Sequence, residues 1–205
     1  MSPVRGMNRR QLVVGTASVI GAVTGGCLAT PERSTGEFRR RTTISETDAV
    51  PKEAPVHFEL EVTDGHITEA GTAFVEFTAT NTSASEITIS PYYKGRSAFD
   101  GQPGILLYAL EAADSPPEDY TPACIDDPAA TEDGVYFTEE GPPMYALDPD
   151  DSVTVRYIVV DDPSVDGCFP PAEYRFESQY LFDEVDVRWG FAIEIADASS
   201  TGDVG

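Results

Sequence analysis

Two histidines and one serine motif are the residues of this sequence best suited to hydrolytic chemistry. His57 lies in an alternating segment, and His66 lies in the polar turn DGHIT. A serine hydrolase places its nucleophile in G-x-S-x-G on a strand-to-helix turn. GRSAF at residues 95–99 lacks the second glycine and a following helical pattern. Because no nucleophile motif is matched with a base, we expect a non-enzymatic protein, and a secreted hydrolase is the least favoured hypothesis.

Metal chemistry is the second use that such residues could have. A blue-copper site needs a cysteine, one histidine and an axial ligand close together near the chain end, and a second histidine elsewhere. After Cys168, the sequence CFPPAEYRF carries Glu173 where a histidine is required, and Met144 is remote. We therefore expect no copper and no other cofactor. Loosely bound Ca²⁺ at acidic loops stays open, with solvated carboxylates as the alternative. The loop acids are Asp126, Asp127, Glu132, Asp133, Asp148, Asp150 and Asp151.

Cys124 and Cys168 predict one disulfide if the protein is exported, because paired cysteines persist in oxidising compartments. The bridge would close a loop of 168 − 124 = 44 residues. The chain-entropy account gives such a loop about 4 kcal/mol of stabilisation. The C-x-x-C spacing of redox proteins is absent. Two free buried thiols are the alternative.

The N-terminus carries the pattern of an export signal. Arg9 and Arg10 precede an apolar stretch at residues 12–26, which is shorter than the roughly 20 residues of a membrane span. The arginine pair followed by Gln-Leu-Val resembles a twin-arginine signal, and TGGC at residues 24–27 resembles a lipobox. These resemblances imply cleavage before Cys27 and a lipid on its sulfur.

We therefore expect residues 1–26 to be a signal peptide that is removed, with translation starting at Met1 or Met7. The lipid on Cys27 would hold the mature protein on the outer face of the cytoplasmic membrane, at the cell surface. The alternatives are an uncleaved anchor and a cleavage that releases a soluble protein.

The mature chain would be strongly acidic. The sequence holds 13 basic and 36 acidic residues, and removal of residues 1–26 takes away three arginines, so its net charge becomes 10 − 36 = −26. Concentrated salt screens such repulsion, since the Debye length falls to about 3 Å at 1 M, and the composition resembles that of proteins from extreme halophiles. A hydrophobic content of 40% is enough for a core. Nucleic acid is not expected as a partner, because its phosphates would be repelled.

The domain organisation follows from a change of pattern near residue 56. Residues 27–55 lack apolar periodicity, which predicts a flexible tether. Its basic cluster at residues 39–41 would contact lipid head groups or solvent. Beyond it, segments such as VHFELEVT (56–63) alternate apolar and polar residues, as half-buried strands do. Seven to eight such segments predict one all-β antiparallel sandwich over residues 56–197, followed by a disordered tail at 198–205.

Three phrases of the sequence resemble Ig-like or fibronectin-type modules of surface proteins. They are FVEFTATNTSASEITIS (74–90), LDPDDSVTVRYIVV (147–160) and PAEYRF (171–176). The resemblance implies an Ig-like sandwich and brings no catalytic residue with it. Antibody domains differ, because they have the order Cys, Trp, Cys, whereas Trp189 follows both cysteines here.

The sequence NTS at residues 81–83 is a glycosylation sequon with Asn81 as acceptor, placed in an expected turn. The alternative is that this turn was selected for the hydrogen bonds of its side chains.

Between residues 111 and 151 the alternation gives way to a long acidic, Pro-rich and aromatic loop. A loop of this length predicts either binding or a need for fastening. Exposed aromatic residues mark interfaces, and the candidate contacts are Tyr92, Tyr93, Tyr120 and Tyr145. We expect a surface module that binds an unknown protein or carbohydrate partner or organises the envelope. The alternative is a substrate-binding or accessory subunit of an exported enzyme or transporter complex, which a cavity lined by aromatic side chains would favour.

Overall fold

The computed structural model describes residues 37–91, 94–96, 104–126, 143–182 and 185–198. Within these ranges the regular structure is β-strand, apart from one short 3₁₀ helix, η1 (Ala123–Ile125). The strands are β1 (Arg39–Thr47), β2 (Val56–Asp64), β3 (His66–Thr68), β4 (Phe74–Asn81), β5 (Ile87–Ile89), β6 (Lys94–Arg96), β7 (Ile105–Ala109), β8 (Tyr145–Leu147), β9 (Ser152–Asp161), β10 (Ala172–Phe182) and β11 (Val185–Asp197). No described helix is long and apolar enough to cross a membrane.

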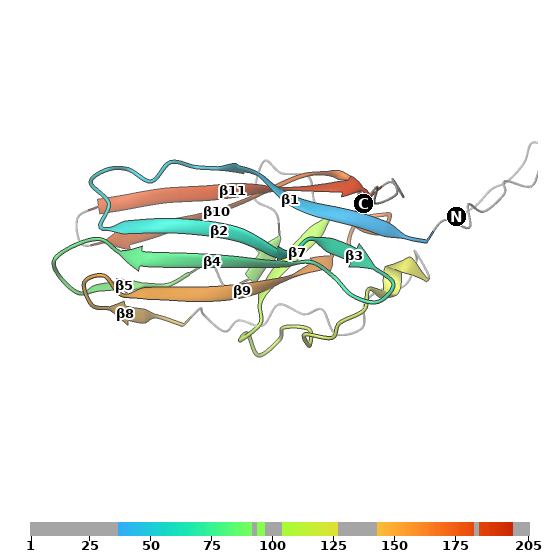
Figure 1. Ribbon diagram of the computed structural model, residues 1–205, viewed down its shortest axis with the longest axis horizontal. Coiled ribbons are helices and arrows are strands. Elements are labelled where there is room, and N and C mark those ends of the chain that lie inside the picture. Colours follow the sequence, from blue (N-terminus) through green and yellow to red (C-terminus); the bar gives the residue numbers. More distant parts are fainter. Residues whose placement is uncertain (1–36, 92–93, 97–103, 127–142, 183–184, 199–205) are drawn as a thin grey trace, which may run out of the picture. The chain divides into compact units, whose positions relative to one another are not determined.

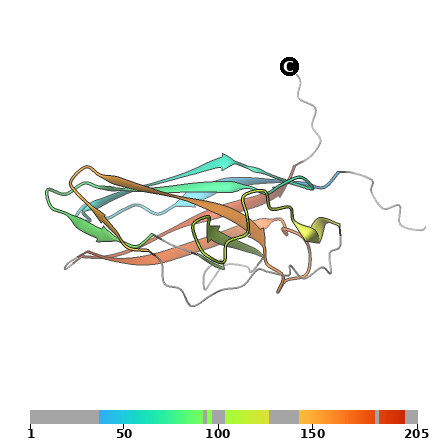
Figure 2. The ribbon, with the colours of Figure 1, turned by 90° about the horizontal axis from the view of Figure 1, so that it is seen from below.

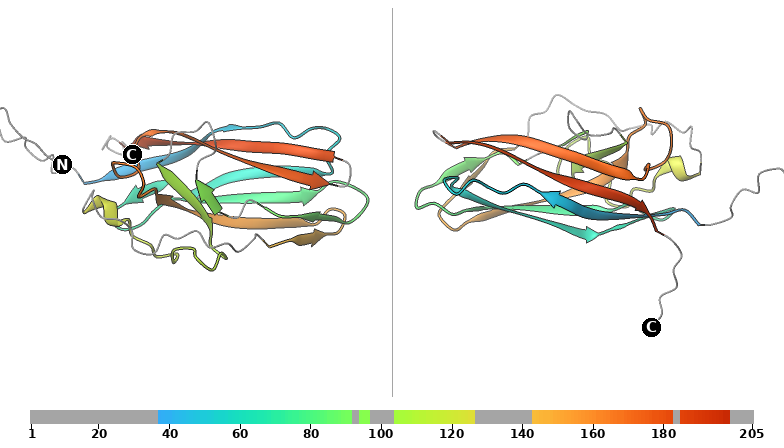
Figure 3. Two further views of the ribbon diagram at one scale, coloured as in Figure 1. Left: turned by 180° about the vertical axis from the view of Figure 1, so that it is seen from behind. Right: turned by 90° about the horizontal axis from the view of Figure 1, so that it is seen from above.

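The strands form an antiparallel sandwich, which confirms the predicted all-β class (Figure 1). One sheet has the order β10-β11-β1-β3 and the other the order β2-β4-β9-β7-β6, while β5 and β8 form a separate pair. Figure 2 shows the layers from the side, and Figure 3 shows β10 and β11 running side by side. The register of β10 and β11 extends from Ala172 opposite Ile195 to Phe182 opposite Val185.

Alternation along the strands produces the core between the two sheets. In β2, Val56 and Phe58 are buried, whereas His57 and Glu59 are exposed. Across the core, the indole of Trp189 in β11 lies with its centroid 4.9 Å from that of Phe58. Tilted aromatic contacts of this kind stabilise a core beyond their buried area. The two sheets are therefore held together by the apolar residues that the period of two had predicted to be buried.

The predicted tether at residues 27–55 is wrong for residues 39–47, which form β1. This strand pairs with β11 from Arg40 opposite Asp197 onward, and its first residues also pair with β3. The Arg40 guanidinium binds the Asp197 carboxylate and donates from Nε to the Phe169 carbonyl at 3.1 Å. The segment RRRTTISET is a strand because two neighbouring strands pair with its backbone. The lipid contact expected for the basic cluster at residues 39–41 therefore does not apply to Arg40, whose guanidinium is bound within the domain. Residues 27–36 and 199–205 lie outside the described residues.

The structure also has more strands than the seven to eight that were expected. The described part of the chain holds eleven, because β1 lies in the segment expected to be a tether and because β3, β6 and β8 were not expected. These last three strands span three residues each, which is too few for alternation to be recognised in a sequence.

The predicted disulfide between Cys124 and Cys168 is confirmed, with the two Cα atoms 5.3 Å apart. It joins η1, in the loop after β7, to the loop between β9 and β10. Next to it, the buried Asp161 carboxylate accepts the Phe169 backbone N–H at 2.6 Å. The bridge thus fastens the start of the long acidic loop to the sandwich.

Candidate functional site

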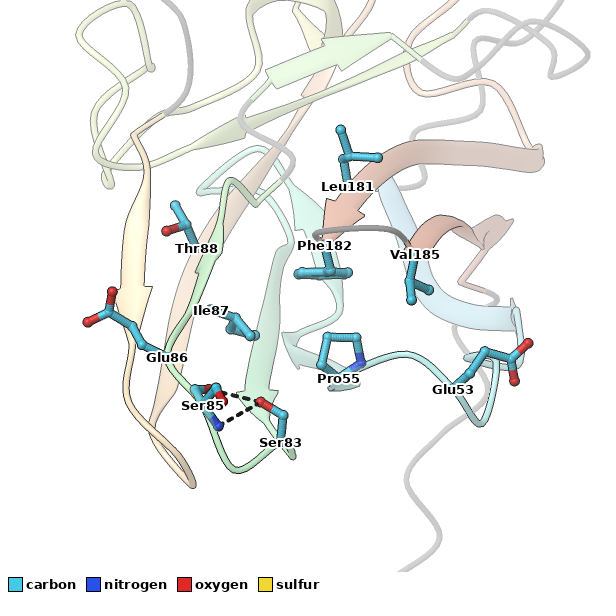
Figure 4. Close-up of a pocket in the computed structure, with 10 residues that line it drawn as sticks. All are labelled: Glu53, Pro55, Ser83, Ser85, Glu86, Ile87, Thr88, Leu181, Phe182 and Val185. Atoms are coloured by element: carbon cyan, nitrogen blue, oxygen red, sulfur yellow. Dashed lines mark hydrogen bonds between the residues drawn. The ribbon is translucent and has the colours of Figure 1, made fainter.

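A groove of about 400 Å³ opens where β2 begins and β4 and β10 end (Figure 4). Pockets of roughly 300–1,000 Å³ are typical of ligand sites. Three parts of the chain that are distant in the sequence line it: residues before β2, the β4–β5 turn with β5, and the end of β10 with the start of β11. The lining residues are Glu53, Pro55, Ser83, Ser85, Glu86, Ile87, Thr88, Leu181, Phe182 and Val185.

The centre of the groove is apolar. Figure 4 shows Pro55 and Phe182 lying between Ile87 on one side and Val185 on the other. Phe182 is buried, and the other three are half-buried. Leu181 beside them is 72% exposed and, with Met144, is one of two large apolar side chains that the described residues leave exposed. An apolar floor that reaches solvent in this way is able to bury part of a partner.

The rim of the groove is acidic. Among the described lining residues, Glu53 and Glu86 are the ionisable ones, and Figure 4 places them on opposite sides of the apolar centre. Both are exposed, and neither forms an ion pair with another described residue. The described lining includes no lysine, arginine or histidine, so these residues give the groove a negative charge.

Asn81 holds the wall of the groove in place. Its side chain is fully buried, and Nδ2 donates to the carbonyls of Ser85 at 2.8 Å and Leu147 at 2.9 Å. Its Oδ1 accepts hydrogen bonds from the backbone N–H and the hydroxyl of Ser83. The Ser83 hydroxyl also bonds Ser85, as the dashed lines in Figure 4 show. The structure thus accounts for Asn81 through the turn alternative, because the nitrogen that would carry a glycan is buried and hydrogen-bonded.

The histidines do not form an acid–base site together. His57 is exposed on β2 with Nε2 3.8 Å from Glu59, and His66 is exposed on β3 with Nδ1 3.6 Å from Asp64. Because β2 and β3 belong to different sheets, each histidine has only a neighbouring surface carboxylate, and neither lines the groove. Of GRSAF, residues 97–99 lie outside the described residues.

The aromatic residues expected as partner contacts have other surroundings. Tyr120 is half-buried against a small cluster that includes Phe74 and Tyr108. Tyr145 is half-buried in β8, and its hydroxyl donates to Glu111 Oε1 at 2.8 Å. Tyr92 and Tyr93 lie outside the described residues. Tyr120 and Tyr145 therefore do not line the groove. The groove itself was not predicted from the sequence.

The aromatic side chains that surround a space belong to the core. Phe77, Tyr157, Tyr180, Trp189 and Phe191 line a space of about 10 Å³. This is about the volume that one water needs. This space among the described core side chains is therefore too small for a substrate.

One cluster of donor atoms in the described residues has metal-like spacing. The Sγ atoms of Cys124 and Cys168 and a carboxylate oxygen of Asp161 lie within 4.8 Å of one another. The two sulfurs are bonded to each other, so they are not free to act as thiolate ligands. The cluster is therefore a structural junction.

Tyr174 is packed into the same junction. Burial raises the pKa of its phenol to about 12, with a further rise from Asp161 and an opposing effect from Arg40. Its hydroxyl donates to the Pro170 carbonyl at 2.5 Å. A phenol held neutral in this way fastens the turn before β10.

The acids expected to hold calcium are dispersed or not described. Asp148, Asp150 and Asp151 are exposed in the turn between β8 and β9, where the Asp151 N–H donates to the Asp148 carbonyl. Asp126 is exposed next to η1. Asp127, Glu132 and Asp133 lie outside the described residues, as do Arg9, Arg10 and Cys27 of the export signal.

No protein-family model, no curated protein and no solved structure matches this chain significantly. The groove and the N-terminal signal are therefore the two features of the molecule that bear on its function.

Proposed function

We propose that this protein is an exported, lipid-anchored and non-enzymatic binding module of the cell surface. The observation that carries the proposal is the groove, which combines an apolar floor, two acids with no ion-pair partner among the described residues, and a rigidly held wall. Such a surface is suited to recognition, since apolar burial supplies affinity and charge supplies selectivity.

The membrane anchor is supported by the arginine pair, the apolar stretch and the TGGC motif, which follow one another in the order of a lipoprotein signal. Because β1 begins at Arg39, the link from Cys27 to the domain holds 39 − 27 = 12 residues. A fully extended chain of that length spans about 40 Å. The groove lies at the other end of β11 from Asp197, the residue that pairs with Arg40, so the anchor would present the groove away from the point of attachment. The acidic composition supports a surface exposed to concentrated salt.

A substrate-binding or accessory subunit is the second candidate. It would be favoured by a cavity lined by aromatic side chains, but the space among the core aromatics measures about 10 Å³. Among the described lining residues of the groove, Phe182 is the aromatic one. These observations favour the binding module.

Mass spectrometry of the membrane fraction tests the anchor. We expect an N-terminal peptide that begins at Cys27 and carries a lipid, and an Arg9→Lys, Arg10→Lys double variant that is not exported. Arg5→Lys is the matched control, because it changes an arginine outside the pair and should leave export intact. A mature protein that begins elsewhere and stays soluble would contradict the anchor, and normal export of the double variant would contradict the twin-arginine route.

A further inference from the structure

We infer that the groove binds an extended segment of a partner protein in which an apolar side chain lies between basic residues. This inference rests on the proposed binding role and specifies the chemistry of the partner. Three properties of the groove carry it: the apolar surface that it exposes, the position of its two acids and the polar atoms of its wall.

The apolar surface requires an apolar group in the partner. Leu181, 72% exposed, also lines the groove; it lies on the opposite face of β10 from the buried Phe182, at the edge of the apolar floor. Covering such surface is favourable in proportion to the area removed from water. Because the apolar area reaches solvent at the edge of the groove, it suits a chain segment that lies across the groove better than a compact ligand that fills it.

The two acids require positive charge on both sides of that apolar group. Glu53 and Glu86 lie on opposite sides of the floor (Figure 4), and neither has an ion-pair partner among the described residues. Anionic lipid head groups and acidic glycans would be repelled by this rim. A peptide with lysine or arginine before and after an apolar residue places one cation near each acid, and charge complementarity at contact distance selects partners.

The wall offers polar atoms to the peptide backbone. Thr88 is exposed on β5 and lines the groove opposite Leu181, as Figure 4 shows. A hydroxyl both donates and accepts hydrogen bonds, so Thr88 is able to bond the N–H or the carbonyl of an extended chain. Asn81 keeps this wall in position through its bonds to Ser85 and Leu147.

The test uses the mature full-length chain and an array of extended synthetic nonapeptides. The central residue of each peptide is Leu, Phe or Ser, and the flanking residues are Arg, Ser or Glu. We expect the strongest binding for an apolar centre with Arg flanks, and a loss of about tenfold when either the centre becomes Ser or the flanks become Glu. Equal binding of Arg- and Glu-flanked peptides, or no binding of any peptide, would overturn the inference.

Variants of the protein locate the binding. Glu53→Gln with Glu86→Gln should weaken the Arg-flanked peptide about tenfold and reduce its salt dependence, and Leu181→Ser should weaken it similarly. The matched control is Glu59→Gln with Glu61→Gln, which removes two charges from the exposed face of β2 and should leave binding unchanged. Thermal unfolding of each variant verifies that it is folded. An equal loss in the control pair would overturn the inference.

The results separate this inference from the proposed function. If neutral or acidic peptides bind best and Leu181→Ser abolishes that binding, the groove is a binding site. The inference that its partner is basic is then wrong. If the Arg-flanked peptide binds but Leu181→Ser has no effect, the groove is not the binding site. The groove then supports neither the proposed binding function nor the inferred partner.

Discussion

Glu61 in β2 lies directly opposite Glu76 in β4. Like charges opposite each other in an antiparallel pair are destabilising by about 0.2–1 kcal/mol. On its other side Glu76 lies opposite Arg156 of β9, whose Nε is 4.0 Å from its carboxylate. Glu61 is exposed and has a second acid two residues away at Glu59. The repulsion between Glu61 and Glu76 therefore destabilises this part of the sheet at low salt, and concentrated salt screens that repulsion.

The first prediction concerns that pair. Glu61→Gln should raise the free energy of unfolding by about 0.2–1 kcal/mol in dilute buffer. The gain should disappear near 2 M salt, where charges are screened within a few ångströms. Thermal unfolding across a salt series measures it. Glu59→Gln is the control, because Glu59 lies opposite Thr78 and should give a smaller gain. A gain that persists in 2 M salt would show that charge repulsion is not the cause.

The second prediction concerns the disulfide, which spans 44 residues. A Cys124→Ser, Cys168→Ser variant should lose about 4 kcal/mol of stability in concentrated salt. In dilute buffer it should lose more, because the acidic loop is then repelled as well as unfastened. Chemical denaturation of both proteins over a salt series gives the two values. Equal stability at every salt concentration, or two free thiols in non-reducing peptide maps, would refute the fastening role.

The third prediction concerns Tyr174, whose pKa burial raises to about 12 from an ordinary value of 10. The folded state prefers the neutral phenol, so its contribution is complete below pH 10 and is lost as the pH rises towards 12. Tyr174→Phe should lack this alkaline loss. At neutral pH it should cost about 0.5–1.5 kcal/mol through the lost hydrogen bond to Pro170.

Denaturation of wild type and Tyr174→Phe between pH 8 and pH 12 tests this titration. The other tyrosines cancel when the two stability curves are subtracted, so the difference reports Tyr174. Two curves that stay parallel over the whole range would show that this phenol does not titrate with folding.

The fourth prediction concerns Asn81. Asn81→Ala would leave the carbonyls of Ser85 and Leu147 without their side-chain donor, and we expect a loss of about 2–4 kcal/mol because buried unpaired groups are costly. Ser83→Ala is the informative control, since it destroys the sequon and retains both donors of Asn81. It should cost about 1 kcal/mol.

Intact mass of the exported protein completes the test of Asn81. We expect a mass without added sugar in the wild type and a much larger loss of stability for Asn81→Ala than for Ser83→Ala. A glycan on Asn81, or equal effects of the two variants, would favour the sequon over the turn.

The local pattern of the sequence was sufficient to predict the class of the fold and its disulfide bond. In β2, alternate residues such as Phe58 and Glu59 already differ in polarity, and a period of two places them on opposite faces whatever the neighbours are. The pairing of Cys124 with Cys168 was predictable because only two cysteines remain beyond the one in the expected signal. These properties depend on neighbours in sequence or on simple counting.

The boundary of the domain and the candidate site were decided by tertiary structure. β1 has an almost entirely polar sequence, and it is a strand because β11 and β3 supply backbone partners on both sides. Asn81 has the sequence of an exposed acceptor, but the carbonyl of Leu147, distant along the chain, completes its burial. The groove joins residues near 55, 87 and 182, and no local pattern records that proximity, because only the packing of the sheets brings those segments together.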